Sequence, residues 1–290
     1  MQPDNKMHPE DMRNLIIFGI LSVILWLSYD NFILQPKIEK MRAAQEIQQQ
    51  AAIAVQSEDG ITVDTERPRA DIISETKSRR VSVSNDLVQG SLNLTGARLD
   101  DLILTQHYKT IERKENSVLL SPAGTPHSQY MEQGWVAAES SIDVPDNKSV
   151  WTLKAGNELT PGKPVTLQWD NRQGLIFEKI ISLNNDYAFD VVQRVVNKTG
   201  NPVTLFPYAL IAQRDVPEDF LGRWIVHEGP IGYFGDELVE ETYRKMDKDS
   251  VIKHSASQGW IALTSKDWLT AVVPTQGQES NYRMTYTKSI

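Results

Sequence analysis

Five histidines and several adjacent carboxylates are the side chains whose types and spacing could support metal binding or acid–base chemistry. The histidines are His8, His107, His127, His227 and His254. No two of them stand four residues apart, and a Gly-Pro pair directly after His227-Glu228 is incompatible with a helical zinc motif. The sequence also lacks a nucleophile elbow, a P-loop and a dinucleotide fingerprint in a strand-to-helix setting. We therefore expect no metal, no cofactor and no nucleotide chemistry.

Adjacent carboxylates occur at Asp100-Asp101, Asp236-Glu237 and Glu240-Glu241. A glycosidase or sugar epimerase would need two carboxyl groups facing one substrate. Neighbouring residues of a strand point to opposite faces of a sheet, so these pairs would not converge there. Solvated turns are the simpler explanation, and we predict no catalytic residue and no enzymatic activity.

Composition excludes further classes of function. The 290 residues carry 30 Lys and Arg against 38 Asp and Glu, a net charge of −8, which disfavours a nucleic-acid partner. There is no cysteine, so disulfides, thiolate metal sites and cysteine nucleophiles are absent. The length is sufficient for one large domain or two modest ones with a buried core.

Residues 15–34 form the most apolar segment of the chain. Its first fifteen residues, Leu15 to Tyr29, carry no charge, and Phe32, Ile33 and Leu34 extend the segment to twenty residues. Trp26 and Tyr29 are suited to the membrane interface. Because no small-x-small cleavage site follows, we predict one transmembrane helix over 15–34 that binds the lipid bilayer, rather than a cleaved signal peptide or a buried core helix.

The sequence also predicts the location and structure of the segments on either side of this helix. Residues 1–14 are a short tail, which we expect in the cytoplasm because a large following domain is translocated largely regardless of its flanking charges. Residues 35–80 are a polar spacer: positions 36–80 carry eight charges of each sign and few large apolar side chains. We expect its first half to continue as a helix and the chain around Pro68 to be extended.

From residue 81 to residue 290 the sequence predicts a mainly β domain. Short apolar runs alternate with period two between Gly, Pro, Asn and Asp, which favours an antiparallel β-sandwich. The expected strands include Ser91–Thr95, Leu99–Thr105, Ser117–Ser121, Val165–Trp169, Leu175–Leu183, Phe189–Val196 and Val203–Ala212. Asn197–Pro202 is predicted to be a hairpin connection and Gly156–Pro164 an exposed loop. The six tryptophans of this part, which could stack on sugars, are more simply core residues: Trp135, Trp151, Trp169, Trp224, Trp260 and Trp268.

Several segments in order carry a family resemblance. They are Gly90–Leu102, Val118–Pro122, Gly134–Ala137, Gly229–Phe234 and Gly259–Pro274. Behind an apolar anchor and a charged spacer, this series resembles the amino-terminal half of the YidC membrane protein insertases of Gram-negative bacteria. The match extends over nearly the whole chain, which makes it more specific than any single motif.

The resemblance implies a periplasmic β-supersandwich, mutarotase-like in fold, held at the bacterial inner membrane by the first transmembrane helix. It implies a chaperone-like role in the insertion, folding and assembly of membrane proteins, with nascent membrane proteins and accessory subunits of the Sec translocon as partners. The insertase helix bundle of that family is not in this sequence, so we expect the domain to be truncated at its C-terminal end. The alternative is a membrane-anchored carbohydrate-binding or mutarotase-like protein.

Overall fold

The computed structural model describes residues 17–18, 21–22, 66–222, 226–246 and 251–286. Residues 17–18 and 21–22 are helical, but the rest of the predicted transmembrane helix, the tail before it and most of the spacer lie outside the described residues. Among the described helices, none has the length and apolar character needed to cross a membrane. The architecture below therefore concerns residues 66–286.

The described fold begins with the short helix α3 (Arg69–Thr76), which continues into the 3-10 turn η2 (Lys77–Arg79). Extended chain was predicted around Pro68, and this prediction is wrong. Pro68 has the extended backbone of an N-cap residue and the helix begins directly after it. A proline is tolerated at this point because the first helical N–H groups have no partner within the helix.

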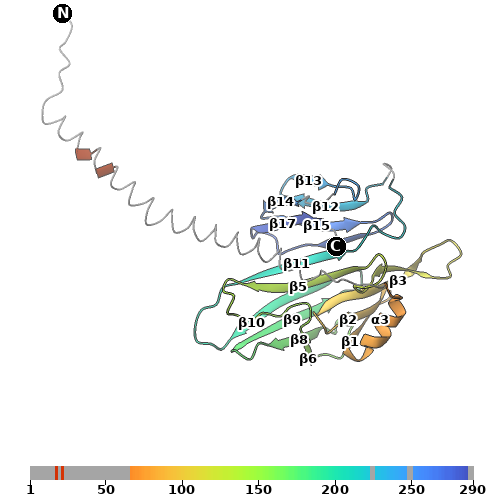
Figure 1. Ribbon diagram of the computed structural model, residues 1–290, viewed down its shortest axis with the longest axis horizontal. Helices are drawn as coiled ribbons and strands as arrows, with labels where there is room; N and C mark the ends of the chain where they lie inside the picture. The colour runs from red at the N-terminus through yellow and green to blue at the C-terminus, as the bar shows by residue number, and fades with distance from the viewer. Residues whose placement is uncertain (1–16, 19–20, 23–65, 223–225, 247–250, 287–290) are drawn as a thin grey trace, which may run out of the picture. The chain divides into compact units, whose positions relative to one another are not determined.

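Two sheets make up a first sandwich, which we define as β1–β11 (Figure 1). The larger sheet has the order β11-β5-β3-β2-β1-β7, with β4 paired to β3, and the smaller has the order β10-β9-β8-β6. The strands are β1 (Arg80–Ser84), β2 (Val88–Asn93), β3 (Arg98–Tyr108), β4 (Asn116–Leu120), β5 (Gln129–Ala137), β6 (Thr152–Ala155), β7 (Glu158–Leu159), β8 (Val165–Asp170), β9 (Leu175–Leu183), β10 (Phe189–Asn197) and β11 (Leu205–Gln213). Every pairing is antiparallel except that of β1 with β7.

The core of the first sandwich lies between these sheets because alternate residues of each strand point inward. On β9, Leu175, Phe177, Ile181 and Leu183 are buried at intervals of two or four residues. The same cluster includes Val81, Val83, Val88, Leu92, Leu104, Leu120, Trp135, Trp151, Val165 and Leu167. The predicted alternation is confirmed, and so is a mainly β, antiparallel fold.

A second β-region, defined as β12–β17, follows along the chain. One sheet has the order β13-β12-β15-β16, and β14 pairs with β17 in a two-stranded sheet. The strands are β12 (Gly229–Phe234), β13 (Glu237–Glu240), β14 (Val251–Ala256), β15 (Gly259–Thr264), β16 (Leu269–Val272) and β17 (Ser280–Thr285). Its own buried cluster consists of Phe234, Met246, Tyr282 and Met284.

Two predicted connections differ from the structure. Asn197–Pro202 was predicted to be a hairpin turn, but β10 pairs with β9 and β11 pairs with β5, so the chain passes here from one sheet to the other. Gly156–Pro164 was predicted to be an exposed loop, yet Leu159 within β7 is fully buried next to β1. Turn residues indicate where a chain reverses direction and carry no information on which strand the next segment pairs with.

Candidate functional site

The histidines are separated in the described structure. His107 packs edge-on against Trp268 with 4.6 Å between ring centroids, and His254 stacks on Phe234 at 4.5 Å. The Nδ1 of His127 lies 2.6 Å from the carbonyl oxygen of Val216. Across the described ranges, no group of three His, Asp or Glu side chains is placed to hold a metal ion.

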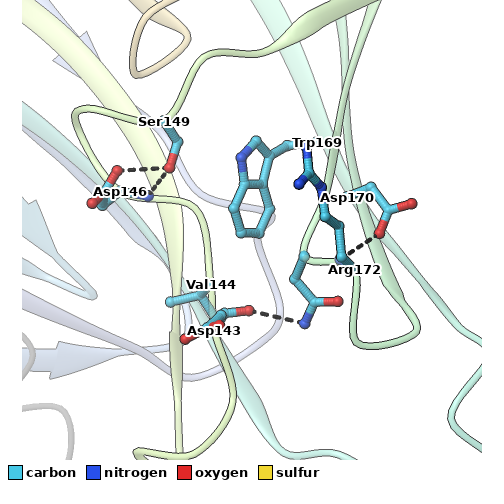
Figure 2. A pocket seen from close by; sticks show the side chains of 8 residues that line it. Asp143, Val144, Asp146, Ser149, Trp169, Asp170 and Arg172 are labelled. Atoms are coloured by element: carbon cyan, nitrogen blue, oxygen red, sulfur yellow. Dashed lines mark hydrogen bonds between the residues drawn. The ribbon is translucent and has the colours of Figure 1, made fainter.

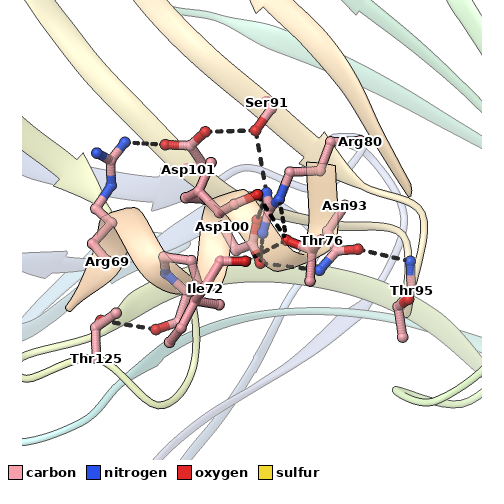
Figure 3. A network of polar contacts seen from close by, with 12 residues as sticks. Arg69, Ile72, Thr76, Arg80, Ser91, Asn93, Thr95, Asp100, Asp101 and Thr125 are labelled. Atoms are coloured by element: carbon pink, nitrogen blue, oxygen red, sulfur yellow. Dashed lines mark hydrogen bonds and ion pairs between the residues drawn. The ribbon is translucent and has the colours of Figure 1, made fainter. Parts of the chain in front are cut away.

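Asp100 and Asp101 are buried in β3, so the prediction of a solvated turn is wrong for this pair. Each carboxylate has its own arginine (Figure 3). Arg80 donates to Asp100 from both terminal nitrogens, at 2.7 and 3.1 Å, while Arg69 pairs with Asp101. Ser91 also donates to Asp101 at 2.5 Å. Five consecutive buried residues begin β3 beside a bulge in its pairing with β2, which is how neighbouring carboxylates both become enclosed.

Burial raises the pKa of the Asp100 carboxyl, and its hydrogen bonds with Arg80 oppose that shift. Both arginines come from the segment that the sequence predicted to be a polar spacer. Their pairing with the buried aspartates compensates the enclosed charges and connects α3 and β1 to β3, and it brings no acid and base to an open substrate site. The other carboxylate pairs are not buried, but only Asp236 lies in the β12–β13 turn. Glu237 and Glu240 are exposed residues of β13, and Glu241 directly after it is partly buried.

The tryptophans of the first sandwich are core residues, as predicted. Trp135 and Trp151 are buried, and Trp135 contacts Phe177 with ring centroids 5.2 Å apart. Trp169 and Trp268 are partly buried and pack against the same cluster. Trp224 lies outside the described residues.

One lysine lies in this aromatic core. Lys179 of β9 is 1% exposed, and its Nζ lies 4.9 Å from the centroid of the Trp151 ring. Burial lowers the pKa of Lys179 to about 7, with Glu132 opposing the shift and Arg98 adding to it. The carboxylate of Glu132 is already occupied, since it accepts hydrogen bonds from Arg98 at 2.5 Å and from the Tyr208 hydroxyl at 2.8 Å. No substrate reaches this amine, so its effect is on stability.

A hollow of about 390 Å³ beside Trp169 is a candidate site for ligand binding (Figure 2). Its lining residues are Asp143, Val144, Asp146, Ser149, Trp169, Asp170, Asn171 and Arg172. They come from the loop after β5, from the end of β8 and from the turn between β8 and β9. The Asn171 side chain joins these two segments by donating to the Asp143 carbonyl oxygen at 3.2 Å.

An indole ring can stack on a sugar ring or on a cation, and carboxylates beside the indole can accept hydrogen bonds from the same ligand. Asp143, Asp146 and Asp170 are exposed at this hollow. Asp146 and Asp170 accept hydrogen bonds from within their own loop or turn, whereas Asp143 accepts one from the Gln173 side chain in the turn after β8. Sequence reasoning did not select these residues. The sequence indicated only Trp169 as a side chain that could stack on a sugar. The other lining residues come from segments that are brought together by the tertiary fold.

A buried carboxylate also stabilises the connection between the two β-regions. Glu228 accepts backbone hydrogen bonds from Leu221 at 3.0 Å and from Gly222 at 2.8 Å. Nearby, burial raises the pKa of the Tyr243 hydroxyl, and the charges of Glu228 and Asp219 act in the same direction. This arrangement fixes the loop before β12, at the start of the Gly229–Phe234 segment.

Comparison with known proteins identifies the family of this fold. The profile of the YidC periplasmic domain matches residues 80–289, which include every strand described above. The chain belongs to the YidC periplasmic domain family. Membership of this family agrees with the expectation that the chain is not an enzyme.

Curated relatives extend the YidC match beyond the domain. The chain is 35% identical over 285 residues to "Membrane protein insertase YidC" of Nitrobacter hamburgensis, covering 96% of this chain and 47% of the relative. It is 41% identical over 204 residues to the protein of the same name from Granulibacter bethesdensis, covering 68% and 35%. It is 36% identical over 211 residues to the protein of the same name from Pelagibacter ubique, covering 73% of this chain and 37% of that relative. The chain therefore spans half or less of the length of these YidC relatives.

Proposed function

We propose that this chain is the membrane-anchored periplasmic part of an insertase that assists insertion, folding and assembly of inner-membrane proteins, alone or with the Sec translocon. The observation that carries the proposal is the match of residues 80–289 to the YidC periplasmic domain. The names of the curated relatives support it, because each is a membrane protein insertase. In this proposal the insertion step belongs to the helix bundle that the family resemblance implies, and this chain contributes a binding surface.

The proposed anchor is the transmembrane helix over residues 15–34, with the tail of residues 1–14 in the cytoplasm and the β-rich domain in the periplasm. Support comes from the sequence of this segment, which has fifteen uncharged residues followed by an apolar extension and carries aromatic residues near its end. The spacer of residues 35–80 would then connect the bilayer to the domain, which we assign to the mutarotase-like supersandwich class.

A periplasmic binding surface requires exposed contacts for nascent membrane proteins or for accessory subunits of the Sec translocon. Exposed apolar side chains on the two β-regions are suited to this, since apolar contact drives most protein association. Among them are Tyr187 before β10 and Leu238 on β13, which is 54% exposed.

Photo-crosslinking in living cells tests the proposal. A photoreactive phenylalanine derivative replaces Tyr187 or Leu238 in the full chain, and buried Phe177 is the matched control position. The proposal predicts light-dependent crosslinks to newly made inner-membrane proteins or Sec subunits from the exposed positions and none from Phe177. An absence of such crosslinks from both exposed positions, with the chain folded and in the membrane, would contradict it.

Glycan binding is the second candidate, and the hollow beside Trp169 is the observation that favours it. Stacking of a sugar on an indole contributes a large part of such binding, so Trp169→Ala would abolish it. Titration of the full chain with a panel of envelope saccharides measures this directly. Binding that is lost in Trp169→Ala and retained in Trp260→Ala supports a glycan site, whereas no binding by the unchanged chain removes it.

A further inference from the structure

Helix α3 is attached to the first sandwich mainly by polar contacts. It has eight residues, none of them buried, and no side chain caps its N-terminus. An isolated helix shorter than about 12 residues is marginal in water, so α3 is helical because it is docked. Its docking contacts therefore determine whether this segment is ordered.

The central docking contact is the ion pair between Arg69 of α3 and Asp101 of β3 (Figure 3). Asp101 is 7% exposed and also accepts a hydrogen bond from Ser91, whereas the Arg69 side chain is 26% exposed. Two weaker contacts assist. The Arg67 N–H donates to the carbonyl oxygen of Gly124 at 3.0 Å, and Ile72 of α3 lies beside Gly124.

The end of α3 is attached differently. Arg80, the first residue of β1, donates through Nε to the Thr76 hydroxyl at 2.7 Å while both terminal nitrogens bind Asp100. Arg80 on β1 and Asp100 on β3 lie on strands that both pair with β2, so their ion pair does not depend on α3. Lys77–Arg79 is exposed and lies between these two attachments, which makes it a suitable hinge.

We propose that α3 is a releasable strap, which detaches from the sandwich as a unit by breaking the Arg69–Asp101 pair while the β-sheets remain folded. Release frees residues 67–78, because the carbonyl oxygen of Arg79 still accepts the Leu94 N–H at 2.8 Å. These residues correspond to about 40 Å of extended chain at roughly 3.3 Å per residue. The strap therefore sets how far the β-rich domain can move from the segment that precedes it. In the cell this consequence rests on the proposed membrane anchor, whereas the release itself does not.

The strap responds to ionic strength, because its main attachment is a partly exposed ion pair. A neighbouring pair gives a matched control. Arg67 and Glu75 pair across the same helix but are 42% and 61% exposed, so this interaction is largely screened and contributes little. Removing the first pair should release the strap, and removing the second should not.

Amide hydrogen exchange of the full 290-residue chain in detergent micelles tests the proposal. We compare the unchanged chain with Arg69→Gln, Asp101→Asn and the control Arg67→Gln, and follow the amides of α3 and β2. Loss of a charge-assisted hydrogen bond predicts exchange at least about tenfold faster in α3 for Arg69→Gln and Asp101→Asn. The control should change exchange by about twofold or less. The amides of β2 should keep their protection in all variants.

Salt provides a second readout. Raising NaCl from about 0.05 M to about 0.5 M should accelerate exchange in α3 of the unchanged chain and leave Asp101→Asn insensitive. The proposal is overturned if α3 and β2 amides exchange at a common rate in every variant. It is also overturned if both pair-breaking variants lose the near-UV circular dichroism of the sandwich, because α3 would then be an integral part of the fold. None of these outcomes depends on whether residues 15–34 span a membrane, so the strap and the anchor can fail separately.

Discussion

The first sandwich and the second β-region both consist mainly of antiparallel strands, but they differ in the number of apolar side chains that each buries. Among the residues that the structure describes, eighteen buried apolar side chains form one cluster between the sheets of the first sandwich, whereas four form the cluster of the second β-region. The larger core also encloses charged groups, among them Lys179 and Glu132. Only a region with ample apolar burial can offset the cost of enclosing such groups. We infer that the first sandwich determines the stability of the domain and that the second β-region opens more easily.

Truncating one aromatic residue in each region should show this difference most strongly. Phe177 is fully buried between Trp135 and Trp169, and Phe177→Ala should lower the free energy of unfolding by about 3–5 kcal/mol. Phe234→Ala removes the ring at the centre of the smaller cluster. Hydrogen exchange should then show lost protection throughout the domain for Phe177→Ala and in β12–β17 alone for Phe234→Ala. Identical exchange patterns in the two variants would show that the two regions unfold as one unit.

Lys179 should make the stability of the first sandwich depend on pH. Its pKa of about 7 in the folded chain lies below the usual value of 10.5, so between these values the unfolded chain binds the extra proton. From this group alone, stability should rise with pH by up to about 1.4 kcal/mol per unit between pH 7 and pH 10.5, and show no further dependence below pH 7.

Lys179→Met removes this pH dependence and should stabilise the fold by about 1–4 kcal/mol near pH 7, because a buried amine is replaced by an apolar group of similar length. Chemical denaturation at several pH values measures both effects. Lys154→Met is the control, since Lys154 is a half-exposed lysine that pairs with Glu178 on the same sheet. Equal pH slopes for Lys179→Met and the unchanged chain would contradict this account of the amine.

Ion pairs in which at least one partner is about half exposed should have the smallest effects. Glu178 is 1% exposed and pairs with both Lys154 and Arg194, and its hydrogen bond with Lys154 is the largest factor that lowers the pKa of its carboxyl. Glu178→Gln should cost about 1 kcal/mol at neutral pH, since one charge of a network is lost. Lys163→Gln breaks an exposed pair with Glu158 and should change stability by less than about 0.5 kcal/mol. Thermal unfolding ranks the two variants, and a larger loss for Lys163→Gln would reverse the predicted order.

The sequence was sufficient where a pattern is local. The period-two alternation of Leu175–Leu183 predicts β9, and the same alternation places Lys179 on the inward face with Phe177 and Ile181, a signal that was available before the structure. The predictions that failed concern residues whose environment depends on partners far away in the sequence. Asp100 and Asp101 are buried because Arg80 and Arg69 reach them from the preceding segment, and no local pattern links those positions.

The hollow beside Trp169 has the same origin. Its walls come from residues 143–149 and 169–172, two segments connected by Asn171 and Asp143. The family resemblance in the sequence was confirmed because it depended on the order of many short segments. The absence of metal or catalytic residues remains a prediction.

The central claim is that the β-rich domain lies in the periplasm on a membrane anchor, and labelling of single cysteines tests it most directly. The chain has no cysteine, so Ile111→Cys, at a position 95% exposed, and Lys6→Cys each provide one reactive site. A membrane-impermeant maleimide is applied to intact spheroplasts that contain either full chain. The account predicts labelling of Ile111→Cys before lysis and of Lys6→Cys only after lysis. Labelling of Ile111→Cys only after lysis would contradict it.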